Sequence, residues 1–416
     1  MQFVSTRKKA PVVMFEEALI RGLAPDGGLY NPVTIPKLSP EVWRRAEDFV
    51  DLARRVLEPW LQEEVPAELL DNLLREALNF PVPLVRVGDV QVLELFHGPT
   101  LSFKDIGARV MARLISHFAS RTPITILVAT SGDTGSAVAD GFAGLPGVRV
   151  AVLYPKGQVS ALQETQLTVK RPGVRVFAVN GSFDKCQVMV KTLLASPGEL
   201  RLSAANSINV GRLLPQMLYY FWAFVQGDLK SANVCVPCGN LGNLTAGVLA
   251  WQSGLPITVF LAAHNANDGF PKYLSGSPTP FGPSVRTLSN AMDVGHPSNF
   301  ERLHVLLDAA TMRRKIKGYS ISDDALLRAM RRVYEQFGYV ADPHTAVALE
   351  AIHRESSPGV VLATAHPAKF SRTVRRALGI NAPEAVALDA LANLETSVTS
   401  LDPIPDTLRA ALADWL

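Results

Sequence analysis

The chain is poor in cysteine, with three among 416 residues, which excludes a disulfide framework and fits a reducing compartment. It also has little net charge, since 41 Lys and Arg stand against 38 Asp and Glu and leave a surplus of +3. So small a surplus gives no bulk attraction to a polyanion, and we expect no nucleic-acid partner. Hydrophobic residues make up 48% of the chain, which is enough for a sizeable core and argues against global disorder.

Long uninterrupted apolar segments are scarce as well. The first nine residues have no apolar centre of the kind found in signal peptides. Residues 244–264 carry no Asp, Glu, Lys or Arg, but the turn formers Gly254-Leu255-Pro256 interrupt them. This favours a helix followed by a buried strand over a membrane span. We therefore expect a cytoplasmic protein with no membrane partner.

The pattern along the chain predicts three parts. Residues 1–85 have helical periodicity punctuated by proline and are expected to form a helical N-terminal unit. From residue 86 to about 380, short β-branched runs alternate with helical stretches, which predicts an α/β region with mostly parallel sheets covered by helices. The Ala- and Leu-rich residues 381–416 are expected to form a helical tail.

A glycine-rich turn follows the predicted strand at 233–236. Its sequence is Gly239-Asn240-Leu241-Gly242-Asn243, and a predicted helix comes next. Backbone N–H groups at such a helix start converge on one spot that favours an anion, and glycines let the backbone approach a ligand closely. The turn lacks the Lys-Ser/Thr ending of an ATP loop and the spacing of a dinucleotide loop. A tight turn without a ligand is the alternative.

Two cysteines flank this strand end, at Cys235 and Cys238. Such a pair can be redox-active or form half of a zinc site, but no second pair exists, so structural cysteines are favoured. The eight histidines show no metal-ligand spacing, and we expect no metal site.

A second strand-to-helix turn, residues 129–136, is rich in hydroxyl groups and contains Ser131, Asp133 and Thr134. These groups could hold a carboxylate or a phosphate, and simple helix capping is the alternative. Lys104 begins another predicted helix after a strand and a turn. The helix dipole and burial there both disfavour its ammonium form, which suits Schiff-base chemistry. Polar groups also follow turns or strands at 342–346 and 364–369.

In chain order, the segments that carry a resemblance are 5–7, 22–30, 97–105, 130–135, 206–209, 239–243, 292–302, 342–345 and 364–367. Together they resemble threonine synthases, which are pyridoxal-phosphate (PLP) enzymes of fold type II, the tryptophan-synthase-β type. The matches run in order from residue 5 to about 370, so the resemblance is specific, while the last 45 residues add little.

The resemblance implies a role for each matching residue. Lys104 would be the catalytic residue and would hold the cofactor through a Schiff base. The cofactor phosphate would lie on Gly239, Asn240, Leu241, Gly242 and Asn243, and Thr364 would bond the pyridine nitrogen. The substrate amino-acid end would lie near Ser131, Asp133 and Thr134. Weaker candidates for the substrate phosphate are Asn206, Ser207, Asn209 and Arg212, whose guanidinium can bind two phosphate oxygens.

The implied reaction converts O-phospho-L-homoserine and water into L-threonine and phosphate, with the enzyme expected as a monomer or homodimer. Lys104, freed from the cofactor, would be the nearest general base and acid. One alternative is another fold type II lyase or dehydratase acting on a hydroxy or O-substituted amino acid. Another is a PLP-binding homologue without catalysis, against which the intact Lys104 and Thr364 argue.

Overall fold

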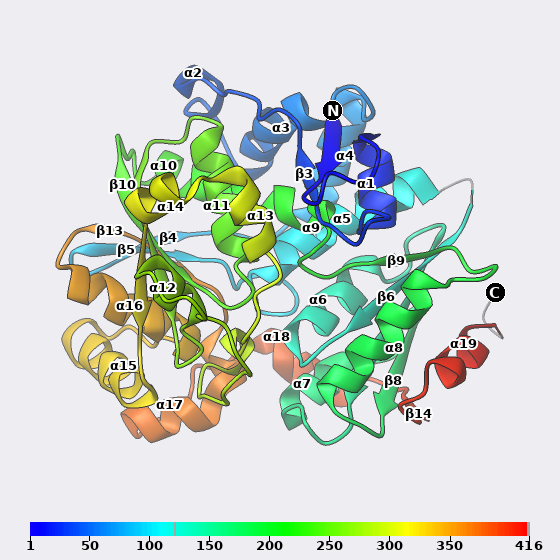
Figure 1. Cartoon of the computed structure of the whole chain (residues 1–416). Coiled ribbons are helices and arrows are strands. Elements are labelled where there is room, and N and C mark those ends of the chain that lie inside the picture. Colours follow the sequence, from blue (N-terminus) through cyan, green and yellow to red (C-terminus); the bar gives the residue numbers. More distant parts are fainter. Residues whose placement is uncertain (120–121, 414–416) are drawn as a thin grey trace.

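Two mostly parallel sheets, each covered by helices, form the body of the molecule, and a smaller sheet lies near the N-terminus (Figure 1). The computed structural model describes residues 1–119 and 122–413. The six-stranded sheet has the order β12 (Ile316–Ser320), β11 (Ile257–His264), β10 (Ala232–Pro237), β13 (Gly359–Ala363), β5 (Val90–Glu94) and β4 (Leu84–Val87). Its neighbours pair in parallel except β4 and β5.

The five-stranded sheet is parallel throughout. Its order is β14 (Thr399–Leu401), β8 (Val174–Val179), β7 (Val148–Pro155), β6 (Ile124–Ala129) and β9 (Leu202–Ala204). The prediction of an α/β fold with mostly parallel, covered sheets is confirmed. In both sheets the strands are rich in buried Val, Ile, Leu and Ala, as expected of strands covered on both faces.

Helices separate the strands in sequence and cover both sheets. On the five-stranded sheet, α6 (Asp133–Phe142) packs on β7, and α8 (Phe183–Ala195) packs on β6, β7 and β9. On the six-stranded sheet, α16 (Pro343–Glu355) packs on β10, β11 and β13. The remaining helices of this region are α5 (Lys104–Ala119), α7 (Ala161–Thr168), α9 (Val210–Leu213), α10 (Met217–Gln226), α11 (Gly242–Gln252), α12 (Gly269–Leu274), α13 (Phe300–Leu306), α14 (Ala309–Lys315), α15 (Asp323–Phe337) and α17 (Ser371–Leu378).

The helical segment from Val210 to Gln226 is divided in the structure. It consists of α9, the 3-10 turn Leu214–Gln216 and α10. Pro215 lies in the middle of this turn and cannot donate a helical hydrogen bond, which explains the break.

The sequence predicted a helical N-terminal unit, but the structure shows that this unit also contains strands. Its helices are α1 (Phe15–Arg21), α2 (Pro40–Trp43), α3 (Phe49–Leu61) and α4 (Ala67–Ala77). It also contains an antiparallel sheet with the order β2 (Val13–Met14), β1 (Gln2–Ser5) and β3 (Tyr30–Pro32). These strands have two to four residues, too few for a period-2 pattern to emerge.

The tail is also not purely helical. After α17, the chain forms α18 (Val386–Asp389), the 3-10 turn Ala390–Asn393, β14 and α19 (Pro405–Ala413). Strand β14 pairs with β8, and α19 packs on α8 with Leu408 and Leu412 buried. The tail therefore belongs to the five-stranded sheet, far in sequence from the strands it joins.

The topology gathers the loops that follow several strands. Strands β10, β13 and β5 are adjacent and parallel, so the loops after them lie at one edge of the six-stranded sheet. These loops lead to Asn240, Thr364 and Lys104, and the loop after β6 leads to Asp133. Among the described residues, no helix combines the length and apolar character needed to cross a bilayer.

Candidate active site

Lys104 and Thr364 lie next to each other although 260 positions separate them in sequence. The N–H of Phe103 donates to the Thr364 carbonyl over 3.0 Å, and the N–H of His366 donates to the Leu101 carbonyl over 3.1 Å. The backbone between these bonds also pairs in an isolated bridge between Ser102 and Ala365. The register of β5 against β13 therefore fixes the start of α5 beside the end of β13.

The amine of Lys104 is surrounded by charged groups. Its Nζ lies 3.9 Å from Oδ2 of Asp133, and its side chain is 17% exposed. Burial lowers the pKa of Lys104, Asp133 opposes this, and the charges of Lys369 and Arg212 lower the pKa further. A fraction of this lysine larger than usual is therefore a neutral amine, which is the nucleophilic form.

The glycine-rich loop after β10 forms a close backbone turn. A Cβ added to Gly239 would stand 2.9 Å from the Cα of Met292, so only glycine fits between these backbones. Leu241 has a left-handed φ of 60° and precedes α11, an eleven-residue helix whose N-terminal amides are set to receive an anion. Asn240 fixes the loop, since its Nδ2 donates to Ser207 Oγ over 2.5 Å and its Oδ1 accepts from the Ser298 N–H.

Asn243, at the end of the loop, has one polar atom occupied and one without a partner. Its Oδ1 accepts from the hydroxyls of Tyr219 and Tyr220, each over 2.7 Å. Its Nδ2 is buried and has no hydrogen-bond partner in the described part of the chain. A buried amide donor beside a cradle of backbone N–H groups is matched by an anionic oxygen ligand, so these residues fit a phosphate group.

In the loop after β6, the alternative to ligand binding was simple capping of the following helix by a side chain, and the structure shows no such cap. Neither Asp133 nor Thr134 caps α6, because Thr130 Oγ1 accepts from the N–H groups of Gly132 and Gly135 over 3.0 and 2.9 Å. Asp133 is buried and pairs through Oδ1 with Lys369 Nζ at 2.8 Å. Ser131 at the same turn is exposed.

The four residues 206, 207, 209 and 212 have different surroundings. The amide of Asn209 is fully occupied: Nδ2 donates to the carbonyls of Leu19 and Ala204, and Oδ1 accepts from the Gly211 N–H, so this side chain caps α9. Asn206 accepts from the Ile208 N–H in the same turn. Arg212 is 3% exposed, and its Nε has no partner among the described residues. Burial lowers the pKa of Arg212 to about 10.

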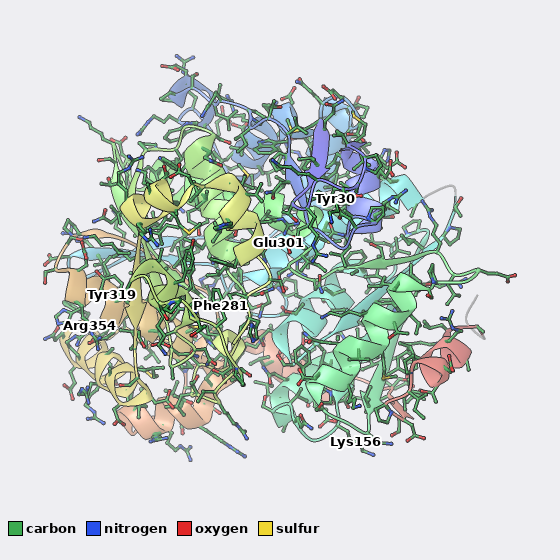
Figure 2. The ribbon with its side chains drawn as sticks, in the orientation of Figure 1. Tyr30, Lys156, Phe281, Glu301, Tyr319 and Arg354 are labelled. Atoms are coloured by element: carbon green, nitrogen blue, oxygen red, sulfur yellow. The ribbon has the colours of Figure 1, made fainter. Side chains whose placement is uncertain are left out.

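Two cationic residues at the site have no individual role predicted from the sequence, although one of them, Lys369, belongs to the polar segment 364–369 noted above. Lys369 lies in the 3-10 turn Pro367–Phe370. It follows a proline and an alanine, and this local sequence does not distinguish it from an exposed lysine. Arg302 on α13 is 0% exposed and donates over 3.2 Å to the Tyr30 carbonyl on β3. Figure 2 labels Tyr30 and Glu301, the residue before Arg302 in sequence, where the N-terminal unit meets α13.

Cys235 and Cys238 are buried, free thiols. Their sulfurs donate to the carbonyls of Ala348 and Val236, each over 3.2 Å, and burial raises the pKa of both thiols. A raised pKa disfavours the thiolate required for redox or metal chemistry, which agrees with the structural interpretation. The described residues contain no group of three or more His, Cys, Asp or Glu side chains placed to hold a metal ion.

Mostly parallel sheets covered by helices, a partly buried lysine at one helix start and a glycine-rich loop before another are features that fit a class of PLP enzymes. Residues 82–365 match the family "Pyridoxal-phosphate dependent enzyme", and the cofactor is pyridoxal 5'-phosphate. Two further families match at either end: "Threonine synthase N terminus" over residues 2–78 and "Threonine synthase, C-terminal" over residues 345–411. The chain belongs to the threonine synthase family.

Relatives match this chain over nearly its whole length. Threonine synthase of Escherichia coli is 42% identical over 379 residues, covering 88% of this chain and 89% of the relative. The crystal structure of PLP-bound threonine synthase from Brucella melitensis has a TM-score of 0.94 at 34% identity and covers 100% of this chain and 99% of that one. Threonine synthase from yeast has a TM-score of 0.88 at 31% identity, with 99% of this chain and 98% of that one covered.

Proposed function

We propose that this protein is a threonine synthase that converts O-phospho-L-homoserine and water into L-threonine and phosphate. The observation that carries the proposal is the 42% identity to the Escherichia coli enzyme over 88% of this chain. Similarity of this extent includes the N-terminal and C-terminal segments as well as the PLP-binding region. The enzyme is a PLP-dependent carbon–oxygen lyase that eliminates phosphate.

In this proposal Lys104 holds the cofactor, and the loop from Gly239 to Asn243 takes its phosphate. The unpartnered Nδ2 of Asn243 and the N-terminus of α11 support this assignment, because both favour an anion. Thr364 lies beside the start of α5 through the backbone bond from Phe103 and serves the pyridine nitrogen. When bound, PLP withdraws electrons from the amino acid, so that its α- and β-protons become removable.

Lys104 then moves the protons. With substrate bound to the cofactor, the amine of Lys104 would be free, and its lowered pKa raises the fraction of the amine that can accept a proton. The same amine returns one proton to Cγ after phosphate has left and the other to Cα after water has added at Cβ. The proton that water loses balances the one that the released phosphate gains. One group that alternates between base and acid therefore suffices for the two carbon-bound protons.

The substrate is held at its two ends. The turn at residues 131–134, with Ser131, Asp133 and Thr134, receives the amino-acid end, where the backbone N–H groups at the start of α6 favour its carboxylate. Asn206, Ser207 and Arg212 receive the phosphate, and the partnerless Nε of buried Arg212 supports this role. Asn209 is retained only as a support, since its amide is fully occupied.

We further propose three units, residues 1–85, 86–380 and 381–416, and a cytoplasmic monomer or homodimer that does not bind nucleic acid. The family matches at 2–78 and 82–365 support the first boundary. Three free, buried cysteines fit a reducing compartment such as the cytoplasm.

The test is phosphate release from O-phosphohomoserine by the purified holoenzyme, with threonine measured in the same sample. We expect equal amounts of phosphate and threonine, and neither from the Lys104→Ala variant. A serine or threonine dehydratase would instead form a 2-oxo acid and ammonia from serine or threonine, and a silent homologue would bind PLP without turnover. Either result would refute the proposal.

A further inference from the structure

A second lysine lies in the site, and the roles proposed above do not use it. Lys369 is enclosed there, with a side chain 1% exposed. Its Nζ donates to the Thr100 carbonyl over 2.9 Å and lies 2.8 Å from Oδ1 of Asp133. A fully enclosed lysine is rare and costly unless it is paired, so its position demands a physical reason.

The carboxylate of Asp133 stands between two lysines. Oδ1 faces Lys369 at 2.8 Å, and Oδ2 faces Lys104 at 3.9 Å. The nearer lysine comes from the turn after β13 of the six-stranded sheet, whereas Asp133 begins α6 after β6 of the five-stranded sheet. The ion pair therefore also joins the two sheets at the site.

The two lysines compete for one negative charge. Were Lys369 absent, Lys104 would be the lysine left paired with Asp133 in the described part of the chain, and Asp133 would favour its ammonium form. Lys104 needs the opposite state, because a protonated amine can neither attack a carbonyl carbon nor accept a proton. Since Lys369 is closer, it neutralises Asp133 at the place where Lys104 must stay neutral.

We propose that Lys369 is a positioning residue that binds the Asp133 carboxylate and thereby keeps the Lys104 amine unprotonated. This inference rests on the proposed role of Lys104. The direction of the pKa of Lys104 agrees: burial lowers it, Asp133 and Asp105 raise it, and Lys369 and Arg212 lower it further.

The surroundings of Asp133 agree with a carboxylate shared by two lysines. Burial alone would raise the pKa of Asp133, but Lys369, Lys104 and His344 together hold it well below its usual range. Gln163 adds a hydrogen bond of 3.3 Å from Nε2 to Oδ1. Asp133 therefore stays an anion at any working pH, and it is always available to attract whichever lysine is free.

The experiment measures the protonation of Lys104 directly in the full-length chain after PLP has been removed with hydroxylamine. Trace acetic anhydride, which acylates only neutral amines, is applied across a range of pH, and the Lys104 peptide is quantified by mass spectrometry. For Lys369→Met we expect the midpoint to move up by about one pH unit, which is roughly tenfold less labelling below the midpoint. For Asp133→Asn we expect the midpoint to move down.

Opposite shifts from the two variants are the signature of the proposed competition. The double variant, without either charge, should have a midpoint between those of the single variants. Lys315→Met is the control for loss of a lysine that donates to two carbonyls, those of Ile257 and Thr258, and it should leave the Lys104 midpoint unchanged. The acid limb of the kcat profile of the holoenzyme should move with the labelling midpoint.

A lower melting temperature with an unchanged Lys104 midpoint in Lys369→Met would make the pair merely structural and overturn the inference. If that variant does not fold, Asp133→Asn decides alone, and an unchanged or raised midpoint refutes the inference. Labelling without cofactor is independent of turnover. Absence of phosphate release in the unaltered enzyme would therefore contradict the proposed function, whereas unshifted labelling would contradict only the role of Lys369.

Discussion

Replacing Arg302 by methionine tests whether one buried guanidinium ties the N-terminal unit to the site. Arg302 is 0% exposed, and its nitrogens donate to four oxygens from three segments. These are the carbonyls of Tyr30 (3.2 Å), Ser207 (3.3 Å) and Ile208 (2.5 Å) and Oδ1 of Asn299 (2.7 Å). None of these acceptors is a carboxylate, and burial lowers the pKa of Arg302 to about 9.

The size of the effect follows from the acceptors that lose their donor. Ser207 O keeps a bond from Asn299 Nδ2 at 3.2 Å, which leaves Tyr30 O, Ile208 O and Asn299 Oδ1 affected. At about 1 kcal/mol for each, the loss is about 3 kcal/mol, and removal of a buried charge returns part of it. We expect Arg302→Met to lower the free energy of unfolding by about 2 kcal/mol.

The assay is urea unfolding followed by circular dichroism, together with the KM for O-phosphohomoserine. KM should rise more than kcat falls, because the 207–208 backbone belongs to the proposed phosphate site. Arg314→Met, at an exposed position on α14, is the matched control and should change stability by less than about 0.5 kcal/mol. An Arg302→Met protein as stable as the control, with an unaltered KM, would refute the reasoning.

Two further predictions concern Asp105 and Gly239. Burial raises the pKa of Asp105 to about 6 from 3.8, although Thr100 donates to it through N–H and Oγ1. The stability that this group contributes is therefore complete below about pH 4 and is lost as pH rises through 6, a change of about 3 kcal/mol. Asp105→Asn should remove this part of the pH dependence, and equal slopes of unfolding free energy between pH 4 and 6 would contradict it. Gly239→Ala should weaken PLP binding at least tenfold, because its Cβ meets backbone at Met292, whereas Gly282→Ala, with nothing within 4 Å, should bind PLP normally; equal dissociation constants would exclude the cradle.

The sequence predicted those elements whose formation depends on residues close together in the chain. The strand, turn and helix around Gly239 follow from a β-branched run, a glycine cluster and an apolar helix, and each signal lies within a few residues of the element. Strands β1, β2, β3 and β14 were not predicted, because they have two to four residues and pair with strands that are distant in sequence. Their pairing depends on tertiary contacts that no local pattern contains.

In the candidate site, too, some residues could be predicted from local sequence and others depend on tertiary contacts. Position after a strand suggested Lys104 and the glycine loop, but only the resemblance put Thr364 beside them, since that proximity arises from the pairing of β5 with β13. The role of Asn209 as a ligand stays a prediction, although its amide caps α9, and an asparagine that caps a helix and one that binds a phosphate look alike in sequence. Lys369 lies in the segment 364–369 that the sequence indicated, but it was given no role of its own because a lysine near a helix start is usually solvated.

The missed residues complete a continuous path of polar contacts through the site. Asp105 accepts from Thr100, the Thr100 carbonyl accepts from Lys369, and Lys369 pairs with Asp133, which faces Lys104. Acidic and basic side chains alternate along this path, with Thr100 between the first two, so a change at Asp105 alters the proton affinity of Lys104 at the other end. Because Lys104 and Asp105 are neighbours in sequence, the path closes into a ring across both sheets. The protonation of the lysine proposed to hold the cofactor is therefore set by residues from three loops, and movement of one sheet relative to the other would change it.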